Sequence, residues 1–187
     1  MLEKAIEYSH QLLKRIVQEG DTVIDATVGN GKDTLFLATL VGKNGTVIGF
    51  DIQDKAIQHT YEKLQEVELQ SQVELHQIGH EHVELFLPKE ELISAAIFNL
   101  GYLPGGNKEI TTEKETTLKS VSAILPSLKI GGFLLLVVYS GHSDGMLEKE
   151  ALLNYVKELD QSKYTVLLYQ FINQKNTPPF LIAIEKR

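Results

Sequence analysis

Two segments in the first third of the chain have the residue types and spacing of a site for a nucleotide-like ligand. The first is Asp25-Ala26-Thr27-Val28-Gly29-Asn30-Gly31. Its glycines let backbone N–H groups approach a ligand, and a helix that follows would aim its positive end at a negative group such as a carboxylate. The second segment begins at Asp51, 20 residues after Gly31, where an acidic side chain can accept hydrogen bonds from both hydroxyls of a ribose.

The alternative is an ordinary strand-to-helix turn with a helix-capping aspartate, but an acid that follows a glycine loop at this distance favours the binding site. A dinucleotide fingerprint would carry a third glycine where this chain has Thr34, so nicotinamide or flavin binding is the weaker interpretation. Asp25 ends an apolar run, where an unpaired charge is costly. We therefore expect it to hold loop N–H groups or an ammonium group of the ligand.

The elements that must position these residues alternate between two periodicities. Apolar residues at helical spacing, or ended by glycine, predict helices over residues 2–19, 31–40, 55–67, 81–86, 111–128 and 146–160. Short apolar, β-branched runs predict strands over residues 22–26, 46–50, 73–77, 95–99, 133–139, 164–171 and 180–185. Such alternation is typical of a parallel sheet with helices on both faces.

The last two strands break this alternation, because residues 172–179 are too few for a crossover helix, so these strands must pair antiparallel or lie apart. An α/β sheet of seven strands, mostly parallel with one antiparallel strand, resembles the Rossmann-like class I methyltransferases. We expect a single domain over residues 1–187. The resemblance implies S-adenosylmethionine as cofactor, with the methionine carboxylate on the glycine loop and the ribose on Asp51.

Ile52 would then pack on the adenine face, and the segment Gly79-His80-Glu81 would lie at the adenine edge, although His80 could equally be a surface histidine. The predicted cofactor-binding residues are Asp25, Thr27, Gly29, Asn30, Gly31, Asp33, Thr34, Asp51, Ile52, Gln53, His80, Glu81 and Asn99.

The segment from Asn99 to Gly106 follows the fourth predicted strand, where class I enzymes address their substrate. The spacing of Asn99 and Tyr102 resembles the Asn-Pro-Pro-Tyr motif of amino-group methyltransferases, with Leu100 and Gly101 in place of the prolines. In that motif the amide oxygen accepts a hydrogen of the amine and the aromatic ring stacks on the target. A simple turn explains Pro104-Gly105-Gly106 equally well.

A second cluster, Tyr139-Ser140-Gly141-His142-Ser143-Asp144, follows the fifth predicted strand. An alkyl ammonium has a pKa of about 10 and must lose a proton before it can attack a methyl group. His142 or Asp144 could take that proton, but capping of the next helix is the more ordinary role of Ser143 and Asp144. The segment from Asn173 to Pro179 could line the substrate mouth or simply connect two strands. The predicted catalytic residues are Asn99, Tyr102 and His142.

Composition excludes several kinds of chemistry. The chain has no cysteine, which removes disulfides, thiolate metal sites, iron–sulfur clusters and a cysteine nucleophile, and so directs methylation of a nucleic acid to nitrogen or oxygen. The net charge of −7 argues against general attraction to nucleic acid, but it allows a local basic patch. We expect a soluble, cytoplasmic protein with no membrane segment and no metal, as a monomer or homodimer.

Four stretches resemble a family of small bacterial proteins known as putative rRNA methylases, one branch of which methylates 5-aminomethyl-2-thiouridine in tRNA. They are Asp25 to Thr34, Gly49 to Gln53, Phe98 to Gly106, and Tyr139 to His142. After His142 the family has Pro-Gly-Gly, whereas this chain has Ser143-Asp144-Gly145. The resemblance implies methylation of the primary amine on the wobble uridine in the anticodon region of tRNA.

The leading hypothesis is therefore an S-adenosylmethionine-dependent N-methyltransferase that gives the 5-methylaminomethyl form of the wobble uridine. An rRNA methyltransferase and a small-molecule methyltransferase are alternatives on the same fold. A non-catalytic domain that binds S-adenosylmethionine is an alternative of a different class.

Overall fold

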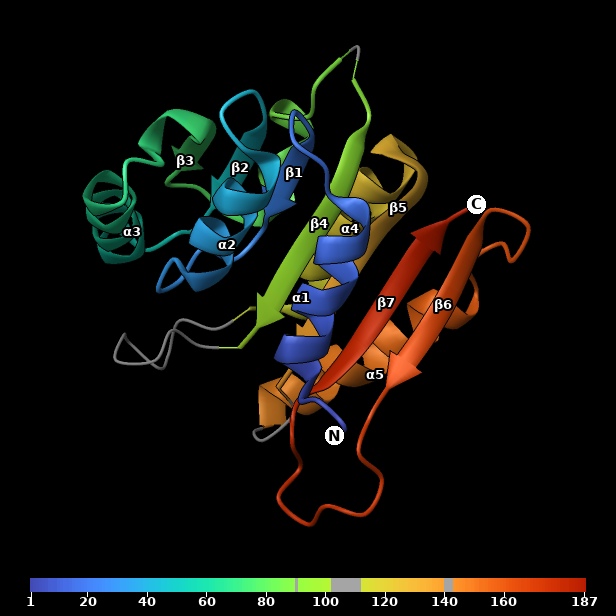
Figure 1. The fold of residues 1–187 in the computed structure, drawn as a ribbon. Helices are drawn as coiled ribbons and strands as arrows, with labels where there is room; N and C mark the ends of the chain where they lie inside the picture. Colours follow the sequence, from blue (N-terminus) through green and yellow to red (C-terminus); the bar gives the residue numbers. More distant parts are fainter. Residues whose placement is uncertain (90, 102–111, 140–142) are drawn as a thin grey trace.

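The computed structural model describes the chain from residue 1 to 187 apart from residues 90, 102–111 and 140–142. Seven strands form one sheet in the order β3-β2-β1-β4-β5-β7-β6, with β3 and β6 at its two edges (Figure 1). The strands are β1 (Thr22–Asp25), β2 (Thr46–Phe50), β3 (Val73–His76), β4 (Ile93–Leu100), β5 (Leu128–Val138), β6 (Tyr164–Tyr169) and β7 (Phe180–Lys186). Because β7 pairs antiparallel with both β5 and β6, the predicted sheet with one antiparallel strand is confirmed.

Helices cover both faces of this sheet. They are α1 (Ala5–Ile16), α2 (Lys32–Val41), α3 (Asp54–Glu66), α4 (Lys114–Ser127) and α5 (Ser143–Lys157), with the short 3-10 helices η1 (Gln70–Gln72) and η2 (His80–Leu85). Alternate residues of a strand point to opposite faces. On β4, Ala95 and Ile97 join the core beneath α1, α2 and α3, whereas Ala96 and Phe98 join the core beneath η2, α4 and α5.

The central strands are buried on both faces, which explains why they are apolar without alternation. Seven of the eight residues of β4 are buried, and the exception is Asn99 near its carboxyl end. The strands β1, β4 and β5 run parallel, so their carboxyl ends meet at one edge of the sheet. A polar residue at the end of one of these strands therefore lies beside those of its neighbours.

Several helices and strands begin or end at residues other than those predicted from the sequence. Helix α1 is shorter than predicted, because Val17 is extended and Gly20 has a φ of 91°. Strand β5 begins at Leu128 rather than at the predicted residue 133, because Leu128 already pairs with Ile93 of β4. The register between the two strands then shifts, so that Phe133 pairs with Ala95, and Gly131 and Gly132 lie within this irregular part of β5. Within the part of the chain that the structure describes, no helix has the length and apolar character needed to cross a membrane.

Candidate active site

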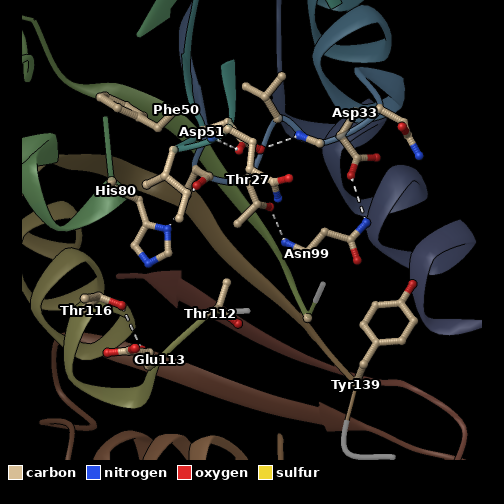
Figure 2. Close-up of a pocket in the computed structure, with 18 of the residues that line it drawn as sticks. Thr27, Asp33, Phe50, Asp51, His80, Asn99, Thr112, Glu113, Thr116 and Tyr139 are labelled. Atoms are coloured by element: carbon tan, nitrogen blue, oxygen red, sulfur yellow. Dashed lines mark hydrogen bonds between the residues drawn. The ribbon is translucent and has the colours of Figure 1, made fainter. Parts of the chain in front are cut away.

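A cavity of about 560 Å³ opens at the carboxyl ends of β1, β2, β4 and β5. Ten of the thirteen predicted cofactor-binding residues line it (Figure 2): Thr27, Gly29, Asn30, Asp33, Asp51, Ile52, Gln53, His80, Glu81 and Asn99. Each of these residues lies near the carboxyl end of a parallel strand, in the loop that follows one, or in the first turn of the next helix. Asp25, Gly31 and Thr34 do not line the cavity.

Asp25 lies behind the glycine loop rather than on the cavity wall. Its side chain is fully buried and accepts hydrogen bonds from the backbone N–H of Thr27 at 3.1 Å and from the hydroxyl of Thr34 at 2.6 Å. Burial, together with the nearby charge of Asp33, raises the pKa of Asp25 to about 7. The expectation that Asp25 holds loop N–H groups fits this geometry, whereas direct contact of Asp25 or Thr34 with a ligand does not.

Gly31 is the residue that turns the chain from this loop into α2. It has a φ of 75°, and a Cβ at this position would lie 2.6 Å from the hydroxyl oxygen of Thr60 on α3. Lys63 of α3 also donates a hydrogen bond to the carbonyl of Asn30 at 2.8 Å. The glycine is therefore needed for the turn and for the close approach of α3.

Asp51 connects the second strand to the loop that follows the first. One carboxylate oxygen accepts the N–H of Gly29 at 2.8 Å, and the other accepts the N–H of Gln53 at 2.9 Å. Each carboxylate oxygen has a second lone pair, so Asp51 can still accept hydrogen bonds from two hydroxyls in the cavity. Burial raises the pKa of Asp51, and the two N–H groups oppose that rise.

His80, the first residue of η2, supplies a buried hydrogen-bond acceptor to the cavity. Its Nδ1 lies 3.1 Å from the carbonyl oxygen of Ala26, so Nδ1 carries the proton and Nε2 is the acceptor. Nε2 is buried and has no hydrogen-bond partner among the described residues. Burial lowers the pKa of His80, which keeps the ring neutral at pH 7. An amino or hydroxyl group of a ligand would satisfy this nitrogen.

Asn99 is held at both its backbone and its side chain. Its backbone N–H donates to the hydroxyl of Thr27 at 2.7 Å, and its amide nitrogen donates to Asp33 at 3.2 Å. The other oxygen of Asp33 lies 2.6 Å from Nε2 of His10 on α1. These contacts join the end of β4 to the loop after β1, to the first turn of α2 and, through Asp33, to α1.

The start of α4 and the residues before it form one wall of the cavity that no sequence pattern predicted. Thr112, Glu113 and Thr116 line this wall. Thr112 is fixed by its hydrogen bond to Glu148 of α5 at 2.9 Å, and Glu148 also accepts a hydrogen bond from Thr117 at 2.7 Å. No motif marks these residues, because their place depends on how α4 and α5 pack against each other.

Tyr139 alone represents the second predicted cluster in the described cavity. It lines the cavity beyond Asn99 (Figure 2), and burial, with the charges of Asp33 and Glu7, raises the pKa of its hydroxyl. The other two predicted catalytic residues, Tyr102 and His142, lie outside the described residues. The described part of the cavity thus offers carboxylate oxygens that can accept hydrogen bonds from hydroxyl groups. It also contains the buried acceptor nitrogen of His80 and the side-chain amide of Asn99, whose orientation is held by Asp33.

The comparison with known proteins agrees with this geometry. The profile of the family described as Putative rRNA methylase matches residues 47–185. The tRNA (mnm(5)s(2)U34)-methyltransferase, chloroplastic, of Arabidopsis thaliana is 37% identical over an alignment of 193 residues, which covers 99% of this chain and 70% of that protein.

Solved structures extend the likeness to the whole chain. A putative rRNA methylase from Clostridium thermocellum is 45% identical with a TM-score of 0.97, and a putative methyltransferase from Streptococcus mutans, solved in complex with SAH, is 45% identical with a TM-score of 0.91. Both comparisons cover 100% of each chain. The chain therefore belongs to the putative rRNA methylase family, and it is a methyltransferase.

Proposed function

We propose that this methyltransferase uses S-adenosylmethionine to methylate the primary amine of a 5-aminomethyl group on the wobble (thio)uridine of tRNA, giving the 5-methylaminomethyl form. The observation that carries the proposal is the 37% identity, across 99% of the chain, to a relative named for that position of tRNA. The S. mutans structure supports the choice of cofactor, because SAH is what S-adenosylmethionine becomes after it gives up its methyl group. The proposal places the enzyme in the cytoplasm, with its substrate.

The residues of the cavity fit an adenosyl cofactor. Asp51 keeps two free lone pairs for the ribose hydroxyls, and Ile52 beside it is exposed and apolar, as a surface that packs against adenine would be. The unpartnered Nε2 of His80 would accept a hydrogen bond from an amino group. The loop around Gly29 and Asn30 would meet the methionine portion. When bound, the cofactor would supply a methyl group on a sulfonium, from which the neutral thioether of SAH leaves readily.

The chain's contribution to the reaction is alignment of the amine. Asn99 would accept one N–H of the amine through Oδ1, so that the nitrogen lone pair points toward the methyl group. An alkyl ammonium has a pKa of about 10 and must first lose a proton. His142 or solvent would accept this proton. Tyr139 would exclude water from the side of the cavity beyond Asn99.

The decisive experiment uses tRNA from cells that lack the gene. When nucleosides from this tRNA are separated and analysed by mass spectrometry, the wobble uridine should be found in its 5-aminomethyl form in place of the 5-methylaminomethyl form. Purified enzyme and S-adenosylmethionine should then restore the missing methyl group in vitro. Unchanged wobble nucleosides in the deletion strain would refute the proposal.

The family description makes rRNA a second candidate substrate. The same deletion strain tests it, because its rRNA can be offered to the enzyme beside its tRNA with labelled S-adenosylmethionine. Label in tRNA alone supports the wobble proposal, whereas label in rRNA alone supports the second candidate. A metabolite extract as a third arm detects a small-molecule substrate.

A further inference from the structure

A three-residue hydrogen-bond chain crosses from α1 to the end of β4. The carboxylate of Asp33 lies between His10 Nε2 at 2.6 Å and the amide nitrogen of Asn99 at 3.2 Å. Asp33 is only 5% exposed, so its charge depends on these partners and on its place in the first turn of α2. The ring of His10 is itself fixed, because it stacks on Phe36 with ring centroids 4.1 Å apart.

The hydrogen bonds from His10 through Asp33 to Asn99 determine which way the amide of Asn99 points. A carboxylate can only accept hydrogen bonds, so the group of Asn99 that faces Asp33 is the NH₂ group. The amide oxygen is therefore turned away from Asp33, on the side of Tyr139, as Figure 2 shows. If the amide rotated by half a turn, it would present a donor to the N–H groups of an amine and would repel them.

We propose that His10 is a positioning residue for methyl transfer, which acts through Asp33 to keep the amide oxygen of Asn99 facing the methyl acceptor. The inference rests on the proposed function, because only an acceptor with N–H groups requires an oxygen at this point. His10 lies 89 residues before Asn99 in the sequence, and no part of the motif around Asn99 indicates it. Without His10, Asp33 would keep a buried charge with one partner fewer and would be free to turn away from Asn99.

The kinetic test compares two substitutions of His10. His10→Phe keeps a ring that can stack on Phe36 but has no nitrogen, whereas His10→Gln places an amide nitrogen near the position of Nε2. We expect His10→Phe to lower kcat on tRNA from the deletion strain, which carries the 5-aminomethyl group, about tenfold, while the KM for S-adenosylmethionine changes less than about twofold. His10→Gln should keep kcat within about threefold of wild type. Ser9→Ala is the control for general loosening of the helix, because Ser9 is a buried neighbour whose hydroxyl donates a hydrogen bond to the carbonyl of Ile6 within α1.

A second measurement needs no substrate. The side-chain amide protons of Asn99 are identified in the NMR spectrum by their absence from an Asn99→Ala variant. Their exchange with solvent should be slow in the wild-type protein and in His10→Gln, and at least about tenfold faster in His10→Phe. Because this readout uses the protein alone, it remains decisive if His10→Phe reduces overall stability or if tRNA proves not to be the substrate.

The outcomes separate the inference from the function. No methyl transfer to tRNA by wild-type enzyme would refute the proposed function, and the exchange rates would still show whether His10 holds Asn99. Equal kcat values for His10→Phe and wild type would overturn the inference. So would unchanged exchange of the Asn99 amide, or a loss of kcat in Ser9→Ala as large as that in His10→Phe.

Discussion

Replacement of Asp25 by asparagine distinguishes a residue that supports the loop from one that binds the cofactor. The carboxylate accepts one hydrogen bond from the N–H of Thr27 and one from the hydroxyl of Thr34. In Asp25→Asn the amide oxygen can still accept from Thr27, and the amide nitrogen can donate to the oxygen of Thr34. The substitution thus removes a buried charge and keeps both hydrogen bonds.

The expected effect on stability follows from the pKa of Asp25. Its pKa is about 7 in the folded protein against an ordinary 3.8, so the folded state holds the proton more tightly than the unfolded state. The stability that protonated Asp25 provides is complete below about pH 4 and is lost as the pH rises to about 7. At about 1.36 kcal/mol per pH unit, the wild-type protein should lose about 2 to 3 kcal/mol between about pH 5 and about pH 8.

Denaturant unfolding at a series of pH values measures this loss as the difference between wild type and Asp25→Asn. The difference should grow in favour of the variant up to about pH 8 and then level off, and Asp54→Asn, an exposed carboxylate, controls for the loss of one negative charge. Calorimetry should give the variant an affinity for S-adenosylmethionine within about threefold of wild type. A pH-independent difference would show that Asp25 is not a desolvated carboxyl, and a large loss of affinity would restore the sequence-based interpretation that it contacts the ligand.

Two other substitutions test the cavity, and a third tests the turn into α2. Asp51→Ala should weaken binding of S-adenosylmethionine by about 1 to 3 kcal/mol in a calorimetric titration, because the ribose loses its acceptors; unchanged affinity would remove Asp51 from the site. Asn99→Ala should leave that affinity nearly intact and abolish most turnover of tRNA, and a variant with full turnover would contradict the role of its amide. Gly31→Ala should lower the free energy of unfolding by about 1 to 2 kcal/mol because alanine is strained at a positive φ, and it should lower it further because the new Cβ overlaps with Thr60. Gly131 has a φ of 76° with open space around it. Gly131→Ala should therefore show only the effect of the positive φ.

The local pattern of the sequence was enough to predict the parallel strands and the edge that carries the site, and the resemblance to class I methyltransferases added the antiparallel strand. A short apolar run such as residues 95–99 is typical of a strand buried on both faces, and the structure extends this strand to Ile93–Leu100. The carboxyl ends of parallel strands meet at one edge of the sheet. Thr27, Asp51 and Asn99 each lie at or just after such an end, so their chain positions alone placed them in one cavity. The strong periodicity of the elements made these predictions possible.

Only the tertiary structure decided which of those residues face the cavity and what holds them. Asp25 and Thr34 belong to the same motif as Thr27, but they point behind the loop, because side-chain direction depends on the turn at Gly29 and Gly31 and on the packing of α3.

His10 and Glu148 carry no motif, and each reaches the site only because its helix packs against a neighbour that is distant in the sequence. Contacts between such segments depend on the packing of whole elements, which residue types and spacing along one chain do not specify.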